Sequence, residues 1–106
     1  MVRKYEACIL LKADLNDVQL GEELKFVEDT IKKSGEIVKI ESLGVRNLAY
    51  PIKKKKEGFF SIFYFQSPPS LINEIKTKLD SKENILRYMI INRKRLPQKK
   101  EKDANS

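Results

Sequence analysis

The chain has 106 residues, with 41% hydrophobic and 35% charged side chains, which suits one soluble globular domain with a single core. It contains no histidine and one cysteine, which excludes Cys-His metal sites, an internal disulfide and catalysis by a histidine base, so we expect no metal and no cofactor. Of the net charge of +7, residues 92–106 supply +4 and Lys53–Lys56 another +4, while the rest of the chain is close to neutral. This placement favours contact with a defined polyanion; the alternative is charge that only keeps the protein soluble.

Residues 2–11 alternate in character, which predicts the first strand. Cys8 falls on the mixed face with Glu6 and Leu10, and because no histidine exists to activate it, we interpret it as a structural residue of the sheet. The apolar run ends at Lys12, too early for a signal peptide or a membrane span, so we expect a cytoplasmic protein without membrane contact. The apolar face carries Tyr5, Ala7, Ile9 and Leu11.

The first helix is predicted over residues 17–34. Asn16 and Gln19 have the spacing of a capping box, and Gly35 suits the position after the C-cap. Helical periodicity predicts a buried stripe of Leu20, Leu24, Val27 and Ile31.

A long second strand is predicted over residues 36–50, with Val38 and Ile40 on one face. Gly44 interrupts it and predicts a bulge or bend, since glycine readily adopts positive φ. Pro51 cannot donate to a strand ladder, so it indicates an edge strand or the end of the strand.

Lys53–Lys56 are predicted to form a hairpin tip that faces solvent or a polyanion, because four consecutive ammonium groups are too well hydrated to pack on apolar atoms. A third strand is predicted from Phe59 to Phe65. Both of its faces are apolar, which is unusual for a sheet that helices cover on one side only. We therefore expect the open face, the one without helices, to contact a partner protein or nucleobases; the alternative is partial cover by the chain's own tail or side chains. One face carries Phe59, Phe63 and Phe65, and the other carries Phe60, Ile62 and Tyr64.

A second helix is predicted over residues 69–80, because Pro68 and Pro69 are tolerated at a helix start. A fourth strand is predicted over residues 84–93. We expect one domain over residues 1–93, followed by a basic tail over residues 94–106 that lacks apolar periodicity and is disordered. The helix buries Ile72, Ile75 and Leu79, and the strand sets Leu86, Tyr88 and Ile90 against Arg87, Met89 and Ile91.

The order βαββαβ predicts an α+β, ferredoxin-like fold, in which a four-stranded antiparallel sheet carries two helices on one face. Such a fold hosts many functions, so function has to be argued from particular residues.

The segment Gly44-Val45-Arg46-Asn47-Leu48-Ala49-Tyr50-Pro51-Ile52-Lys53 resembles the sequence pattern of bacterial small-subunit (30S) ribosomal protein six. The likeness continues in Arg3-Lys4-Tyr5-Glu6, in Gly58-Phe59-Phe60 and in Asn84-Ile85-Leu86-Arg87-Tyr88-Met89, and it covers roughly residues 2–93. The resemblance implies the ferredoxin-like fold and a structural constituent of the small ribosomal subunit. It also implies two partners, the central domain of small-subunit (16S) rRNA and small-subunit ribosomal protein eighteen.

Clustered lysine and arginine side chains are what phosphate neutralisation requires, and double-stranded RNA is recognised mainly through phosphates, 2′-hydroxyls and shape. The motif adds a guanidinium group at Arg46 and an aromatic ring at Tyr50. The predicted RNA-binding residues are Arg3, Lys4, Arg46, Tyr50, Lys53, Lys54, Lys55, Lys56, Arg87, Arg93, Lys94 and Arg95. The predicted protein-partner residues are Leu48, Ala49, Tyr50, Met89 and Ile91.

Two other functions compete with this one. A non-ribosomal RNA-binding module of the same fold would stack bases on its third strand, but Glu57 and Phe60 stand where that motif needs a basic and a small residue. An acylphosphatase-like enzyme would need a loop of backbone N–H groups around phosphate after the first strand. Residues 12–16 contain no glycine and carry Asp14, so we expect no catalytic residue and no small-molecule substrate.

Overall fold

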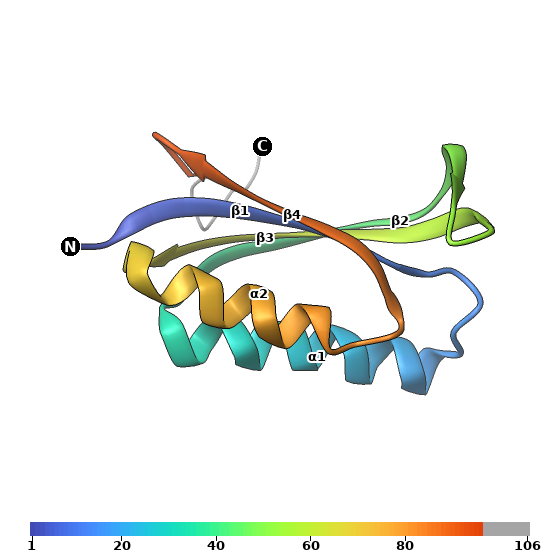
Figure 1. Cartoon of the computed structure of the whole chain (residues 1–106), viewed down its shortest axis with the longest axis horizontal. Helices are drawn as coiled ribbons and strands as arrows, with labels where there is room; N and C mark the ends of the chain where they lie inside the picture. The colour runs from blue at the N-terminus through green and yellow to red at the C-terminus, as the bar shows by residue number, and fades with distance from the viewer. Residues whose placement is uncertain (97–106) are drawn as a thin grey trace, which may run out of the picture.

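The structure is a computed structural model that describes residues 1–96. Its four-stranded antiparallel sheet has the order β2-β3-β1-β4, and both helices cover one face of it (Figure 1). The predicted ferredoxin-like βαββαβ fold is therefore confirmed. The elements are β1 (Arg3–Lys12), α1 (Asp17–Ser34), β2 (Glu36–Ile52), β3 (Lys55–Ser67), a short 3-10 helix (Pro69–Leu71), α2 (Ile72–Asp80) and β4 (Ile85–Arg93).

β4 ends at Arg93, directly before the residues that were predicted to form a basic tail. Lys94, Arg95 and Leu96 belong to no helix or strand, and residues 97–106 lie outside the described residues. No helix in the described part of the chain has the length and apolarity needed to cross a membrane.

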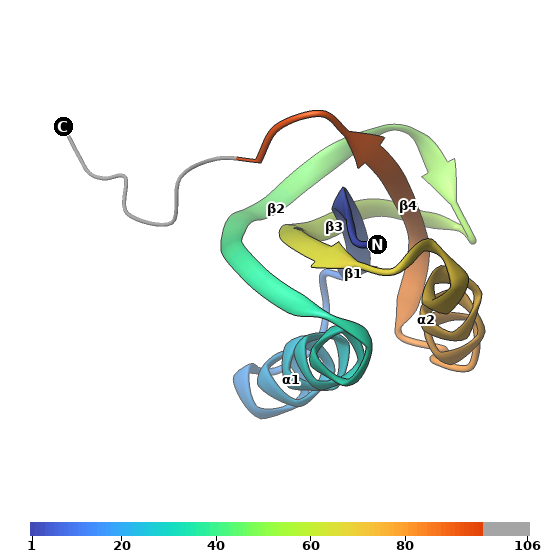
Figure 2. The same ribbon diagram turned by 90° about the vertical axis from the view of Figure 1, so that its left-hand side faces the viewer.

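The core lies between the two helices and the twisted sheet, and Figure 2 shows these two layers from one end. The face of β1 that was predicted to be apolar lies at its centre. The rings of Tyr5 and Phe65 stack with centroids 5.5 Å apart, which joins β1 to β3. The buried cluster consists of Tyr5, Ala7, Ile9, Leu11, Val27, Ile31, Phe63, Phe65, Ile75, Leu79 and Ile85.

Both ends of α1 lie where the sequence predicts them. The side chain of Asn16 accepts a hydrogen bond from the backbone N–H of Gln19 at 2.8 Å, and the Gln19 side chain accepts one from the Asn16 N–H at 3.2 Å. Gly35 is itself the C-cap and has an extended backbone, with φ of −169°. Glycine is required there for space, because a Cβ atom would overlap the carbonyl oxygen of Gln66.

The face pattern of β2 differs from simple alternation. Its register against β3 shifts between Ile37 and Lys39, so Ile37 lies opposite Phe65 and packs on the core. Simple alternation predicts that Val38 and Ile40 share one face. That prediction fails because the bulge contains an extra residue, which shifts the face pattern between Ile37 and Lys39.

The start of β4 is held by a second bulge and by a buried polar contact. The register shift places Ile85 opposite Leu11, so that Ile85 joins the core beside a buried Leu86. Just before the strand, the side chain of Asn84 donates a hydrogen bond of 2.9 Å to the buried carboxylate of Glu23 on α1. Asn84 and the Lys82 ammonium, which lies 3.6 Å from the other carboxylate oxygen, together stabilise this buried charge.

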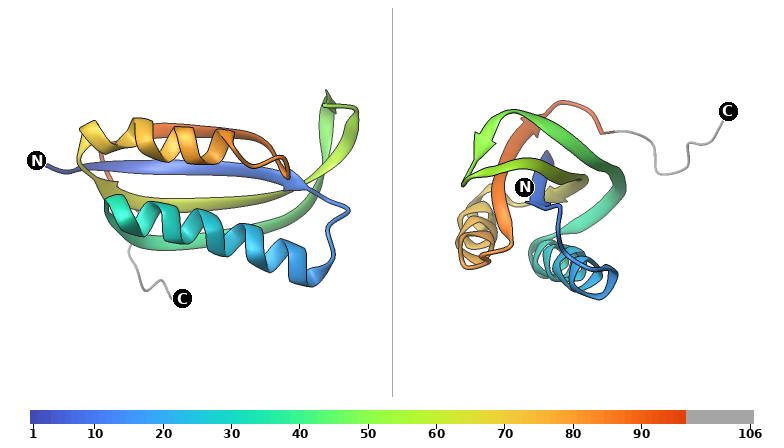
Figure 3. Two further views of the ribbon diagram at one scale, coloured as in Figure 1. Left: turned by 60° about the horizontal axis from the view of Figure 1, so that its bottom comes forward. Right: turned by 90° about the vertical axis from the view of Figure 1, so that its right-hand side faces the viewer.

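The β2–β3 hairpin extends past the rest of the sheet and curves away from the helices (Figure 3). We call residues 47–57 the hairpin arm. The predicted bulge at Gly44 is confirmed, with φ of +82° and a register shift beside it, and Pro51 lies on the edge strand as expected. The prediction that four lysines form the turn is wrong, because only Lys53 and Lys54 do so and β3 begins at Lys55 rather than Phe59. Both turn residues have positive φ, 49° and 67°, a geometry that suits a two-residue hairpin turn and lets the strands pair up to it.

Tyr88 ties β4 to α2 and gives the fold an alkaline pH dependence. Its hydroxyl donates to a carboxylate oxygen of Asp80 at 2.7 Å, and burial, followed by this bond, raises the pKa of Tyr88 to about 12. Because the unfolded chain loses this proton first, the contribution is complete below the ordinary tyrosine value of 10.0 and is lost as the pH rises through about 12. At neutral pH, Tyr88→Phe should lower the free energy of unfolding by roughly 1 kcal/mol.

Urea unfolding of the wild type and of Tyr88→Phe over this pH range measures the effect. The difference between the two proteins should shrink as the pH rises. A constant difference would contradict the assignment of the alkaline dependence to Tyr88.

Candidate nucleic-acid interface

The open face of the sheet has an apolar centre that the hairpin arm partly covers. The arm and the sheet enclose a cavity of about 230 Å³. Met89 and Ile91 nevertheless remain 56% and 42% exposed. The chain therefore covers part of its own open face and leaves an apolar patch beside the cavity. The cavity is lined by Cys8, Leu10, Leu48, Ala49, Tyr50, Ile52, Phe60, Arg87, Tyr88 and Met89.

A contact between Arg87 and Tyr50 connects the arm to β4. An Nη atom of Arg87 donates to the Tyr50 hydroxyl at 3.0 Å, and its guanidinium carbon lies 5.8 Å from the centroid of the ring. Tyr50 is still 58% exposed, so its ring is held in place and also presented to solvent. Two predicted site residues that are distant in sequence thus meet across the open face.

The predicted protein-partner residues converge at this place. Leu48, Ala49 and Tyr50 reach the cavity from the arm, and Met89 reaches it from β4. Ile91 does not line the cavity, but it lies two residues further along the same face of β4. The structure thus brings four of these five residues to one cavity and places the fifth beside it.

The other end of the open face carries a polar network. Arg93 pairs with Glu6 at 2.6 Å and lies over the ring of Tyr64 at 5.7 Å. The Tyr64 hydroxyl donates to Glu41 at 3.1 Å, and burial, followed by this bond, raises the pKa of Tyr64. Arg93 is therefore exposed but already paired within the protein.

Most of the remaining predicted RNA-binding residues form two clusters rather than one. Three exposed lysines, the tip lysines, lie at the end of the hairpin arm: Lys53, Lys54 and Lys56. Lys4, Lys94 and Arg95 lie at the opposite end of β1, where the Lys4 ammonium donates to the Lys94 carbonyl at 3.5 Å. Lys4 and Lys12 are eight positions apart on β1, a span of about 27 Å, and the arm begins beside Lys12.

Arg3 and Arg46 lie apart from these clusters. Arg3 is exposed at the start of β1 and alternates with the core residue Tyr5, so it lies on the helix side of the sheet. The Nε atom of Arg46 donates to the carbonyl of Leu43 at 3.1 Å, across the bulge at Gly44. Arg46 therefore stabilises the bend from which the arm departs.

Five residues that line the cavity were not predicted as site residues, namely Cys8, Leu10, Ile52, Phe60 and Tyr88. The two apolar faces of β3 indicate that Phe60 faces the open side of the sheet. They do not indicate that the arm covers it, because the path of the arm depends on contacts between residues far apart in the sequence. Burial, followed by the charge of Glu6, raises the pKa of Cys8, which agrees with its interpretation as a structural residue.

Three comparisons with known proteins point the same way. The sequence profile of the family described as Ribosomal protein S6 matches residues 4–92. The small ribosomal subunit protein bS6 of Helicobacter hepaticus is 40% identical over 94% of this chain and 72% of its own length. The bS6 protein of Campylobacter lari is 35% identical over 85% and 73%. Among solved structures, the 30S ribosomal protein S6 of Thermotoga maritima has a TM-score of 0.84 at 25% identity, covering 88% of this chain and 89% of that one.

The family match covers most of the chain, and the solved S6 structure from Thermotoga maritima shares its fold. Because proteins of this family are structural and non-enzymatic, the acylphosphatase-like alternative is excluded and the expectation of a non-catalytic protein is confirmed. The chain therefore belongs to the ribosomal protein S6 family, the structural constituents of the small subunit of the bacterial cytoplasmic ribosome.

Proposed function

We propose that this protein binds the central domain of small-subunit rRNA together with small-subunit ribosomal protein eighteen. One observation carries the proposal: the motif that resembles the family forms an apolar cavity at Leu48–Tyr50 and ends in exposed lysines at Lys53 and Lys54. The same arm thus offers two chemistries, one suited to protein and one suited to RNA.

Phosphate and protein contacts are assigned to separate parts of the surface. The tip lysines and the cations around Lys94 project into solvent, where they can replace the counterions of an RNA backbone. The side chains of Met89 and Ile91 have no group that binds phosphate, but their exposed apolar surface suits the centre of a protein interface. Tyr50 and Arg87 are assigned to the protein side, because their mutual contact places both at the cavity.

A pull-down from bacterial lysate, split into untreated and ribonuclease-treated halves, tests the proposal. Small-subunit rRNA and ribosomal protein eighteen should co-purify, and the protein pair should survive digestion. Loss of that protein after digestion would show that RNA alone connects the two. Absence of both from the untreated half at moderate salt would overturn the proposal.

Met89→Asp should weaken pairing with ribosomal protein eighteen by at least about tenfold, because it places an uncompensated charge at the centre of an apolar contact. Met89 is 56% exposed, so the fold should tolerate the change. Calorimetric titration of the purified partner measures the affinity, and thermal unfolding checks the fold.

Val18→Asp is the matched control, since it makes the same type of change at an exposed apolar residue in the first turn of α1, far from the cavity. It should leave pairing unchanged. If both variants weaken pairing equally, or if neither variant weakens it, the partner does not bind at the open face.

A further inference from the structure

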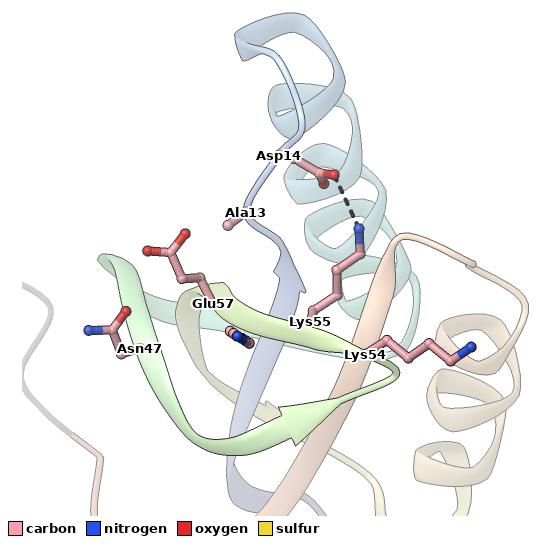
Figure 4. Close-up of a pocket in the computed structure, with 7 residues that line it drawn as sticks. Ala13, Asp14, Asn47, Lys54, Lys55 and Glu57 are labelled. Carbon is pink, nitrogen blue, oxygen red and sulfur yellow. Dashed lines mark hydrogen bonds and ion pairs between the residues drawn. The ribbon is translucent and has the colours of Figure 1, made fainter.

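A second cleft, of about 600 Å³, lies between the β1–α1 connection and the hairpin arm (Figure 4). Ala13 and Asp14 line one side of it, and the arm supplies the other. Three lysines and two acidic residues line the cleft, which therefore has net positive charge beside the arm's tip. The residues from the arm are Asn47, Lys54, Lys55, Lys56 and Glu57.

Lys55 is held differently from the other lysines of its run. Its ammonium donates to a carboxylate oxygen of Asp14 at 3.2 Å. Figure 4 shows the Lys55 side chain extending toward Asp14, while that of Lys54 points away. Within residues 1–96, the three tip lysines make no ion pair and are exposed. One cation of the run is therefore neutralised inside the molecule.

Another anion can replace the Asp14 carboxylate as the partner of Lys55. The two side chains are 67% and 39% exposed, so water and salt ions reach both charges. The hydrogen bond from Lys55, followed by its charge, lowers the pKa of Asp14, as expected for a carboxylate that pairs with an ammonium group. An exposed ion pair of this kind is weak and is screened by salt, so another anion can displace Asp14.

An RNA phosphate has the chemistry needed for this exchange. Like the Asp14 carboxylate, it presents anionic oxygens to an ammonium group. Consecutive phosphates along a strand can engage the tip lysines and Lys55 together, because Lys54 and Lys56 border the same cleft. A single small anion lacks that additional attraction.

We propose that Asp14 is an internal competitor for RNA phosphate, occupying Lys55 until a backbone phosphate enters the cleft and replaces it. This inference rests on the RNA binding proposed above and adds a residue that tunes it. Asp14 weakens binding to every polyanion, and only a strand that also engages the tip lysines compensates for the lost pair. The aspartate thereby raises the selectivity of the lysine run.

A double-mutant cycle tests the competition. Asp14→Asn should tighten binding roughly two- to fivefold, the range expected for release of an exposed pair. In a Lys55→Met background the same change should have little effect, because no lysine remains to be released. Binding is measured with the full chain, ribosomal protein eighteen and a fragment of the central domain of small-subunit rRNA.

Two control variants separate competition from simple charge removal. Glu57→Gln removes a carboxylate from the same cleft that makes no ion pair within the described residues, so its effect should be equal in both backgrounds. Asp29→Asn breaks a comparable exposed pair, with Lys25 at 3.6 Å on α1, and should leave RNA affinity unchanged. NMR titration of the Asp14 carboxyl should give a lower pKa in the wild type than in Lys55→Met.

Each other outcome overturns the inference. An equal gain from Asp14→Asn in both backgrounds would mean that Asp14 only repels RNA. A loss of affinity would mean that the pair positions the arm for binding, and an Asp14 pKa that Lys55→Met does not change would mean that the pair is absent in solution. If the wild type binds RNA but the cycle shows no coupling, only this inference fails; if the wild type fails to bind RNA, the proposed function fails with it.

Discussion

Replacing Lys53, Lys54 and Lys56 together with alanine is expected to lower rRNA affinity on the order of 100-fold at about 0.15 M salt. The logarithm of affinity should also fall less steeply with the logarithm of salt concentration, with a slope that is smaller by roughly 2 to 3. The reason is that a protein with fewer phosphate contacts releases fewer counterions from the RNA when it binds. The tip lysines are exposed and have no ion pair within residues 1–96, so the fold should be unaffected. Filter binding over a series of salt concentrations measures both quantities.

The matched control replaces three exposed lysines of the helical layer, Lys25, Lys33 and Lys76, which removes the same charge on the other side of the sheet. This variant should keep the wild-type slope and lose little affinity. If both triple variants lose affinity equally, binding responds to net charge alone. An unchanged slope for the tip variant would show that the arm does not contact phosphate.

The largest loss of stability is expected from Phe63→Ala. Phe63 is fully buried between the sheet and the helices, so truncation removes its contacts and leaves a cavity that packed neighbours cannot fill. The free energy of unfolding should fall by about 3–5 kcal/mol. Urea unfolding measures this loss, and Phe63→Leu, expected to cost roughly 1–2 kcal/mol, covers the case in which the alanine variant does not fold.

Phe60 provides the internal comparison, because it lies three residues earlier on the same strand and faces the half-covered cavity of the open face. Phe60→Ala should destabilise the fold by only about 1 kcal/mol, since the ring is partly exposed before any partner binds. It should weaken pairing with ribosomal protein eighteen. Equal destabilisation by the two alanine variants would show that the open face contributes to the core as much as the helix side does.

Local chemistry explains why much of this fold can be predicted. The bounds of α1 follow from the capping box at Asn16 and from the helical stripe, both of which are set by residues a few positions apart. The core face of β1 follows in the same way from alternation. Alternation fails in β2 and at the start of β4, where one extra residue in a bulge moves Ile37 and Ile85 onto the core.

Periodicity, capping and motif can be read along the chain, and they predict the βαββαβ order, the two apolar faces of β3, the family and the set of candidate residues. The tertiary fold groups those residues in space. It curved the arm over the open face, joined Arg87 to Tyr50 and paired Lys55 with Asp14. These contacts join residues 37 and 41 positions apart, and they depend on strand register and on the bend at Gly44. No local sequence pattern predicts contacts over such separations in the sequence. The arrangement of an apolar centre between two basic ends is therefore visible only in the folded sheet.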